Sequence, residues 1–146
     1  MNNSFEIIFS AIFANLIAQI YKFAAYYVVN KKINIKILFQ TGGMPSSHSS
    51  FMMGMTTSTG LVSGFDSVPF AIALIVSLVV MYDAAGLRRS VGRQAAVLNE
   101  IVAELFSEHP HLSTQRFREL LGHTPIEVFS GAILGFIIAM WIHMLS

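Results

Sequence analysis

The chain has 146 residues, of which 54% are hydrophobic and only 12% are charged. A soluble domain carries about 25% charged residues, so much of this surface must face something other than water. The composition excludes an ordinary soluble globule and predicts an integral membrane protein with a single domain over residues 1–146. Because the chain has no cysteine, disulfides and thiolate metal sites are also excluded.

Four apolar segments are long enough to cross a membrane, which takes about 20 helical residues. They cover residues 6–29, 47–65, 68–86 and 124–145. The first follows MNNSFE rather than a basic stretch, so we interpret it as a retained helix and not a signal peptide. The second is rich in Gly, Ser, Thr and Met, which favours a helix packed inside a bundle. The predicted fold is all-α, an integral membrane bundle of about four transmembrane helices.

The connections predict how these helices are joined. The short turn SGFDSVP indicates an antiparallel hairpin of the second and third segments, with Pro69 in a first helical turn. After the third segment, RRSVGRQAAVLNEIVAELF is dense in helix formers, so we expect the third helix to extend into the cytoplasm. A short amphipathic helix is expected around residues 114–121.

The basic residues lie almost entirely in the two long connections, residues 30–46 and 87–123. Of the nine Lys and Arg residues, only Lys22 lies inside a predicted span. Basic connections are retained on the cytoplasmic side during membrane insertion. The pattern therefore predicts a multi-pass protein of the cell membrane, with both long connections in the cytoplasm and both termini outside.

Three polar clusters interrupt the apolar pattern at predicted helix ends. They are TGGMPSSHSS at 41–50, YDAAGLRRSVGRQ at 82–94 and GHTPIEV at 122–128. The predicted topology brings all three to the cytoplasmic face. We therefore expect the three clusters to form one functional site there.

The first cluster has the features of an anion cradle. Gly43 permits backbone conformations that other residues resist, and the free N–H groups of a helix start attract negative charge. Ser46 or Ser47 would cap the helix, and His48 can exchange a proton near neutral pH. The alternative is that glycine and proline only break the chain while the serines cap the helix.

The second cluster and the first helix supply further polar residues. Arg88 and Arg89 would hold phosphate through their forked donors. Taken alone, the two arginines are better explained as ordinary topology determinants that touch lipid headgroups. Asp83 lies near the membrane boundary, where an acid usually has a partner. Lys22 either snorkels to the interface or points into the bundle as a further phosphate ligand.

The third cluster sets His123 four residues before Glu127. If the helix begins near Thr124, this spacing brings the carboxylate within reach of the imidazole. A carboxylate that orients a histidine is a recurrent arrangement for a histidine nucleophile or base. The alternative is that His123 caps the helix and Glu127 complements its positive end. The other histidines, interpreted as incidental and without a metal site, are His109, His111 and His143.

The blocks GGMPSSHS, MYDAAGLRRSVGRQAAVLN and LLGHTPIEVFSGAILG, together with AQIYK in the first helix, carry a resemblance that covers nearly the whole chain. They resemble the signature blocks of a divergent, small bacterial and plant branch of the type 2 phosphatidic acid phosphatase superfamily. That superfamily is also related to acid phosphatases and vanadium haloperoxidases.

The resemblance implies roles for individual residues. PSSH is similar to the superfamily's Pro-Ser-Gly-His block, with Ser47 in place of glycine, which makes His48 the candidate general acid. HTPIE is similar to His-x-x-x-Asp, with Glu127 replacing aspartate, which makes His123 the candidate nucleophile. Phe117 stands where the superfamily has an arginine six positions before the nucleophile, and the superfamily's early Lys-x6-Arg-Pro block is absent.

Together, the residues and the resemblance predict a membrane hydrolase that acts on a phosphomonoester or pyrophosphate of a lipid through a phosphohistidine. The expected substrates are of the phosphatidate, phosphatidylglycerophosphate or prenyl phosphate class. The residues expected to act are His48, His123 and Glu127 in catalysis, and Lys22, Gly43, Ser46, Ser47, Asp83, Arg88 and Arg89 in phosphate binding.

The expected partners are the membrane and the lipid substrate, with no cofactor, no metal and no nucleic acid. A homodimer would complete the bundle, since the chain is shorter than the usual six-helix members of that superfamily. The alternative functions are a lipid-phosphate binding or transport protein that has lost turnover, and a purely structural membrane partner.

Overall fold

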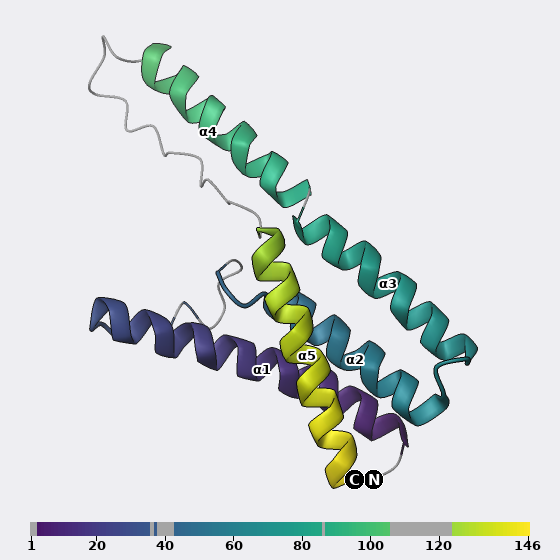
Figure 1. The fold of residues 1–146 in the computed structure, drawn as a ribbon. Coiled ribbons are helices and arrows are strands. Elements are labelled where there is room, and N and C mark those ends of the chain that lie inside the picture. Colours follow the sequence, from purple (N-terminus) through teal and green to yellow (C-terminus); the bar gives the residue numbers. More distant parts are fainter. Residues whose placement is uncertain (1–2, 36, 38–42, 86, 106–123) are drawn as a thin grey trace.

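The computed structural model describes residues 3–35, 37, 43–85, 87–105 and 124–146. Its helices, labelled in Figure 1, are α1 (Asn3–Asn30), α2 (Ser47–Ser63), α3 (Val68–Ala85), α4 (Leu87–Leu105) and α5 (Pro125–Leu145). These described residues contain no strand, and the predicted all-α class is confirmed. The short helix expected at 114–121 lies outside the described residues.

Helix α2 lies at the centre of the bundle and packs against α1, α3 and α5. Most of its residues are buried, and all of the buried ones except Met52 are glycine, serine or threonine. Small side chains let the backbones of neighbouring helices approach closely. The prediction that the second helix packs inside the bundle is confirmed.

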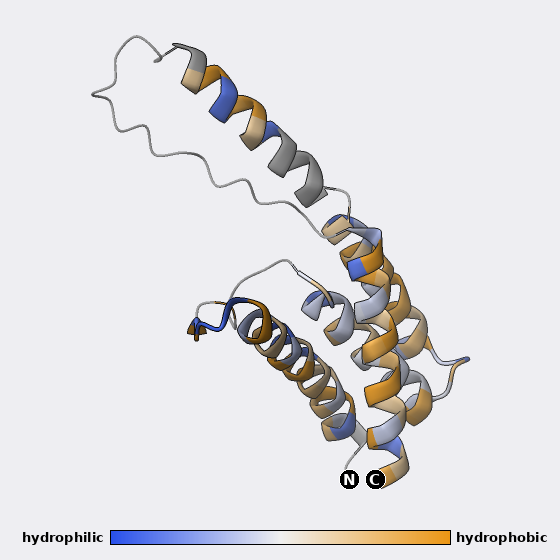
Figure 2. Ribbon diagram, turned by 60° about the vertical axis from the view of Figure 1, so that its left-hand side comes forward, coloured by the Kyte–Doolittle hydropathy of each residue, from blue (hydrophilic) through white to orange (hydrophobic). Residues whose placement is uncertain are grey.

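Three helices in the described part of the chain are long and apolar enough to cross a membrane. They are Ser4–Asn30 within α1, together with α3 and α5. Their outward surfaces expose large hydrophobic side chains such as Ile20, Ile75 and Ile137, and Figure 2 shows the hydrophobic colouring along these helices. Where the sequence predicted about four crossings, the structure shows three such helices packed around the shorter α2.

Two glycines set the close approach of α2 and α5. A Cβ atom added at Gly131 would collide with the backbone carbonyl of Ser46, and one added at Gly135 would collide with that of Ser50. Because the two glycines lie four residues apart, they fall on the same face of α5. This spacing of small residues is typical of closely packed membrane helices.

The connection from α2 to α3 is a short turn, and buried hydrogen bonds join the two helices that it connects. Gly64 has φ +94°, a left-handed backbone conformation that favours glycine. The hydroxyls of Thr56 and Ser77 lie 2.6 Å apart, and Ser77 Oγ donates to the carbonyl of Met52 at 3.2 Å. These bonds join the two helices inside the bundle, and the predicted antiparallel hairpin is confirmed.

The two chain ends meet at one end of the bundle. His143 Nδ1 lies 2.7 Å from Glu6 Oε1, and Ser146 Oγ donates to Glu6 Oε2 at 3.1 Å. Glu6 is only 4% exposed, so these contacts satisfy a buried carboxyl. His143 therefore joins α5 to α1 at the end of the bundle away from the predicted site. The starts of α2 and α5 lie toward the other end of the bundle (Figure 1).

Helix α4 projects from the bundle where α3 ends, and it contacts only α3 in the described part of the chain. Figure 2 shows hydrophilic and hydrophobic residues mixed along its described part. The expected extension of the third helix is therefore present, but as a separate helix that begins at Leu87.

Candidate functional site

Ser46 caps the start of α2. Its Oγ accepts a hydrogen bond from the Ser49 N–H at 3.3 Å, and its carbonyl accepts one from Ser50 Oγ at 3.0 Å. Before the cap, Gly43 has φ +79°, which lets the chain turn into the helix. Of the two serines predicted to cap this helix, the structure confirms Ser46.

Thr124 caps the start of α5. Its Oγ1 accepts from the Glu127 N–H at 3.3 Å, while its own N–H donates to Glu127 Oε2 at 3.1 Å. This reciprocal pair is a capping box, and Thr-x-x-Glu before an apolar run is the sequence signal for it. The expected helix start near Thr124 is confirmed. The alternative that His123 caps the helix is wrong, because Thr124 holds that position.

The starts of α2 and α5 are joined directly. The Ser46 N–H donates to the carbonyl of Glu127 at 3.0 Å. The contact of Gly131 with the Ser46 carbonyl holds the same two segments together one turn further along α5. Because a helix start carries partial positive charge, this junction puts two such ends side by side.

Lys22 reaches this junction from α1. Its side chain is 7% exposed, and its Nζ donates to Ser47 Oγ at 3.3 Å. The ammonium also interacts electrostatically with the carboxylate of Glu127. Gly43, in the loop before α2, also lies close to the Lys22 side chain: a Cβ added at Gly43 would be 3.6 Å from Lys22 Cδ. Of the two expectations for Lys22, the structure shows the one in which it points into the bundle.

These contacts bring together residues from α1, α2, α5 and the loop before α2. We call Lys22, Gly43, Ser46, Ser47 and Glu127 the Lys22 cluster. It holds one buried cation, one carboxylate and two helix starts, so its potential is positive at the helix ends. This combination of a cation with two helix starts is chemically suited to an anion. The described residues contain no group of three His, Cys, Asp or Glu side chains that could hold a metal ion.

Two of the other predicted site residues lie at the same end of the molecule. His48 is half-buried in the first turn of α2, directly after Ser47. Asp83 is half-buried in the last turn of α3. Within the described residues, no hydrogen bond or ion pair joins Asp83 to the Lys22 cluster.

The remaining predicted residues fall where side chains are not described. The backbone of Arg88 and Arg89 forms part of the first turn of α4, directly beyond the end of α3, and their side chains lie outside what the structure describes. His123 lies outside the described residues altogether. Their proposed roles therefore rest on the sequence.

A family model described as "Divergent PAP2 family" matches residues 3–138 of the chain. The chain belongs to this family. An uncharacterized membrane protein of Bacillus subtilis (strain 168), YuiD, is 36% identical over 141 residues, which cover 90% of this chain and 89% of that protein. No solved structure matches the chain.

Membership of the divergent PAP2 family confirms the resemblance seen in the motifs and relates the chain to a phosphatase superfamily. The matched residues include α1 to α4, the first two thirds of α5 and the whole Lys22 cluster. Together with the three apolar helices and the membrane relative, the match identifies a multi-pass membrane protein.

Proposed function

We propose that this divergent PAP2 family member is a membrane hydrolase that removes phosphate from a phosphorylated lipid. The observation that carries the proposal is the buried Lys22, whose ammonium meets the joined starts of α2 and α5. Ionisable residues inside membrane helices usually mark a functional site, because a buried charge is costly. An anionic phosphate would find there both a cation and the positive ends of two helices.

The hydrogen bonds within the cluster suggest different roles for Ser46 and Ser47. The Ser46 N–H is taken by the Glu127 carbonyl, so we assign Ser46 to holding the two helix starts in place. Ser47 Oγ accepts from Lys22, which leaves its own hydroxyl proton to donate to a phosphate oxygen. Gly43 adopts the positive φ that turns the loop into α2 beside Lys22, a conformation that favours glycine.

The proposed reaction has two steps at the phosphorus atom. In the first, a ring nitrogen of His123 attacks phosphorus, the bond to the lipid oxygen breaks, and protonated His48 gives its proton to that oxygen. In the second, water attacks the phosphohistidine, neutral His48 takes a proton from the water, and inorganic phosphate leaves. Lys22 and the helix starts stabilise the charge on the transferring group.

Glu127 and the residues near the end of α3 have supporting roles in this proposal. Glu127 stabilises the charged form of the His123 ring. Arg88 and Arg89 supply phosphate charge in place of the superfamily arginine, whose position Phe117 occupies. Asp83 is proposed to orient one of these arginines. The substrate class is phosphatidate, phosphatidylglycerophosphate or prenyl phosphate, reached from the cytoplasmic side.

Phosphate release by purified protein tests the proposal. The wild type should release phosphate from at least one of the three lipid classes, and His48→Ala and His123→Ala should abolish release. Lys22→Met should raise KM about 10- to 100-fold, because a hydrogen bond to a charged group contributes about 1.5–3 kcal/mol. Lys32→Met, at an exposed position beyond α1, is the matched control and should behave as wild type.

The same assay separates the proposal from its rival. Saturable binding of a lipid phosphate without release by the wild type would show a binding or transport protein, which the substitution of the superfamily arginine by Phe117 favours. Release that survives both histidine substitutions would refute the phosphohistidine mechanism.

A further inference from the structure

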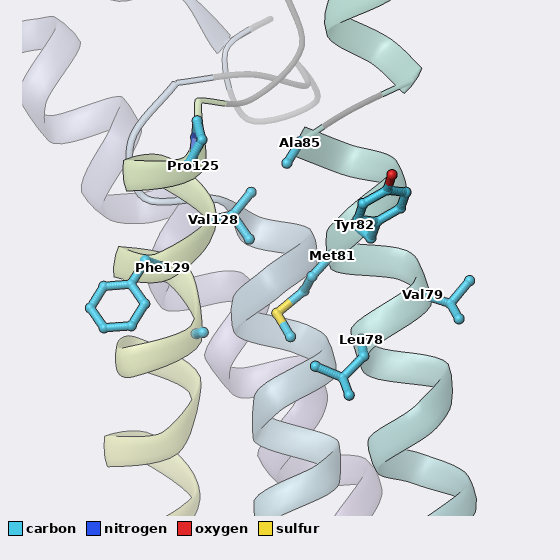
Figure 3. A pocket seen from close by; sticks show the side chains of 9 residues that line it. Leu78, Val79, Met81, Tyr82, Ala85, Pro125, Val128 and Phe129 are labelled. Atoms are coloured by element: carbon cyan, nitrogen blue, oxygen red, sulfur yellow. The ribbon is translucent and has the colours of Figure 1, made fainter.

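An apolar groove runs between α3 and α5 (Figure 3). Its volume is about 640 Å³, within the range of roughly 300–1,000 Å³ that is usual for small-molecule sites. Both helices that form its walls are candidate membrane spans, so the groove opens toward hydrocarbon. The residues that line most of it are Leu78, Met81, Tyr82, Val128, Phe129 and Ala132.

One end of the groove lies at the start of α5, the helix turn that carries Glu127 of the Lys22 cluster. Pro125 and Val128 line the groove and flank Glu127 on α5, and the Glu127 carboxylate interacts with Lys22. Figure 3 shows Pro125 at the same end as Ala85, the last residue of α3. A molecule with a charged head at the cluster could therefore lay an apolar tail along the groove without leaving the surface of the bundle.

We propose that the α3–α5 groove holds one hydrocarbon chain of the lipid whose phosphate binds at the Lys22 cluster. The headgroup part of this inference rests on the function proposed above, and the groove adds how the lipid is oriented. A negative head complements Lys22, and the apolar walls complement a chain.

The groove contributes orientation more than affinity. A chain that moves from the bilayer into the groove exchanges one hydrocarbon environment for another, so the hydrophobic effect contributes little. Fixing the chain along α5 instead fixes where the phosphoester lies relative to Lys22 and His48, and such positioning strongly affects the rate of reaction. We therefore expect the protein to select lipids that carry both a phosphate headgroup and a hydrocarbon chain.

Photolabelling of the full chain in phosphatidylcholine nanodiscs tests the proposal. The probe is a non-hydrolysable phosphonate analogue of phosphatidate that carries a diazirine in one acyl chain. The comparison probe is phosphatidylcholine with the same labelled chain. We expect the phosphonate to label residues 78–82 and 128–132 several-fold more than the choline lipid does. Lys22→Met should remove this difference.

Two variants that fill the groove and one control sharpen the test. Ala132→Trp should lower phosphonate-dependent labelling at least several-fold, whereas Ile137→Trp, exposed on α5 but outside the groove, should leave it unchanged. Leu78→Trp fills the groove from α3 and replaces Ala132→Trp if that variant does not fold.

Equal labelling by the two lipids, or labelling that survives Ala132→Trp and Leu78→Trp, would overturn the inference. A change in oligomeric mass caused by these variants would show that a second copy of the chain occupies the groove, and would overturn it as well. Head-dependent labelling without phosphate release from any lipid would contradict the proposed enzyme activity while supporting the groove.

Discussion

Lys22 brings a buried positive charge to the joined starts of α2 and α5. Its ammonium donates to the hydroxyl of Ser47 and interacts electrostatically with the carboxylate of Glu127, which also accepts from the Thr124 N–H. The two helix starts beside it add positive potential. A bound anion would interact favourably with this cation and with both helix starts. The buried cation beside two helix starts is the physical basis for the proposal that phosphate binds at Lys22.

Glu127 caps α5, and we also propose that it stabilises the charged form of His123; a pair of substitutions can separate these two roles. Glutamine is also accepted at this position of a capping box, so Glu127→Gln should keep the cap and the thermal stability while it removes the negative charge. We expect phosphate release to fall about 10-fold or more, because the charged form of His123 loses its partner. Thermal unfolding and release kinetics measure the two effects.

Thr124→Ala is the matched control for Glu127→Gln. It should cost about 1 kcal/mol of stability through loss of the cap and leave the carboxylate charge in place. If Glu127→Gln released phosphate at the wild-type rate, Glu127 would be a helix cap and nothing more.

At the level of elements, the site depends on how closely α2 and α5 pack. Gly131→Ala should destabilise the protein by about 1–3 kcal/mol and weaken lipid-phosphate binding, because the added methyl group meets the backbone of Ser46 at the helix junction. In the matched control Gly60→Ala, the methyl group meets mainly the Phe65 ring, which is exposed and can turn away. Thermal unfolding in detergent compares the two variants. Equal stability would show that the α2–α5 contact is not tight.

The helix positions were largely predictable because their signals are local. Apolar runs predicted spans at 68–86 and 124–145, and the structure has Val68–Ala85 and Pro125–Leu145. The capping box of Thr124 and Glu127 and the four-residue spacing of Gly131 and Gly135 are local sequence signals of the same kind. Which backbone these glycines meet depends on two helices coming together, and no local pattern contains that information.

For the whole molecule, the predicted topology places the starts of the second and fourth apolar segments on the same face, and the structure confirms that the starts of α2 and α5 are joined. The structure also shows that Lys22 of α1 reaches this junction, whereas the sequence left two interpretations of Lys22 open. The contact between Glu6 and His143 joins residues 137 positions apart, so charge patterning along the chain could not reveal it. The roles of Arg88, Arg89 and His123 stay predictions.

The distribution of basic residues predicts the orientation in the membrane, and single cysteines can test that prediction, since the chain has none of its own. Lys32→Cys and Asp66→Cys both lie at exposed positions, one after α1 and one in the α2–α3 turn. In intact cells an impermeant maleimide should label Asp66→Cys, and Lys32→Cys should react only after permeabilisation. The reverse pattern would place the Lys22 cluster on the outer face.

Determination of the structure with bound vanadate examines the proposed phosphate site itself, since vanadate mimics a phosphoryl group in transfer. We expect one vanadate oxygen within hydrogen-bond distance of Lys22 Nζ, about 2.7–3.2 Å, and a second against the first turn of α2 near Ser47. Vanadate bound elsewhere, with the hydrogen bond from Lys22 to Ser47 unchanged, would contradict a phosphate site at the Lys22 cluster.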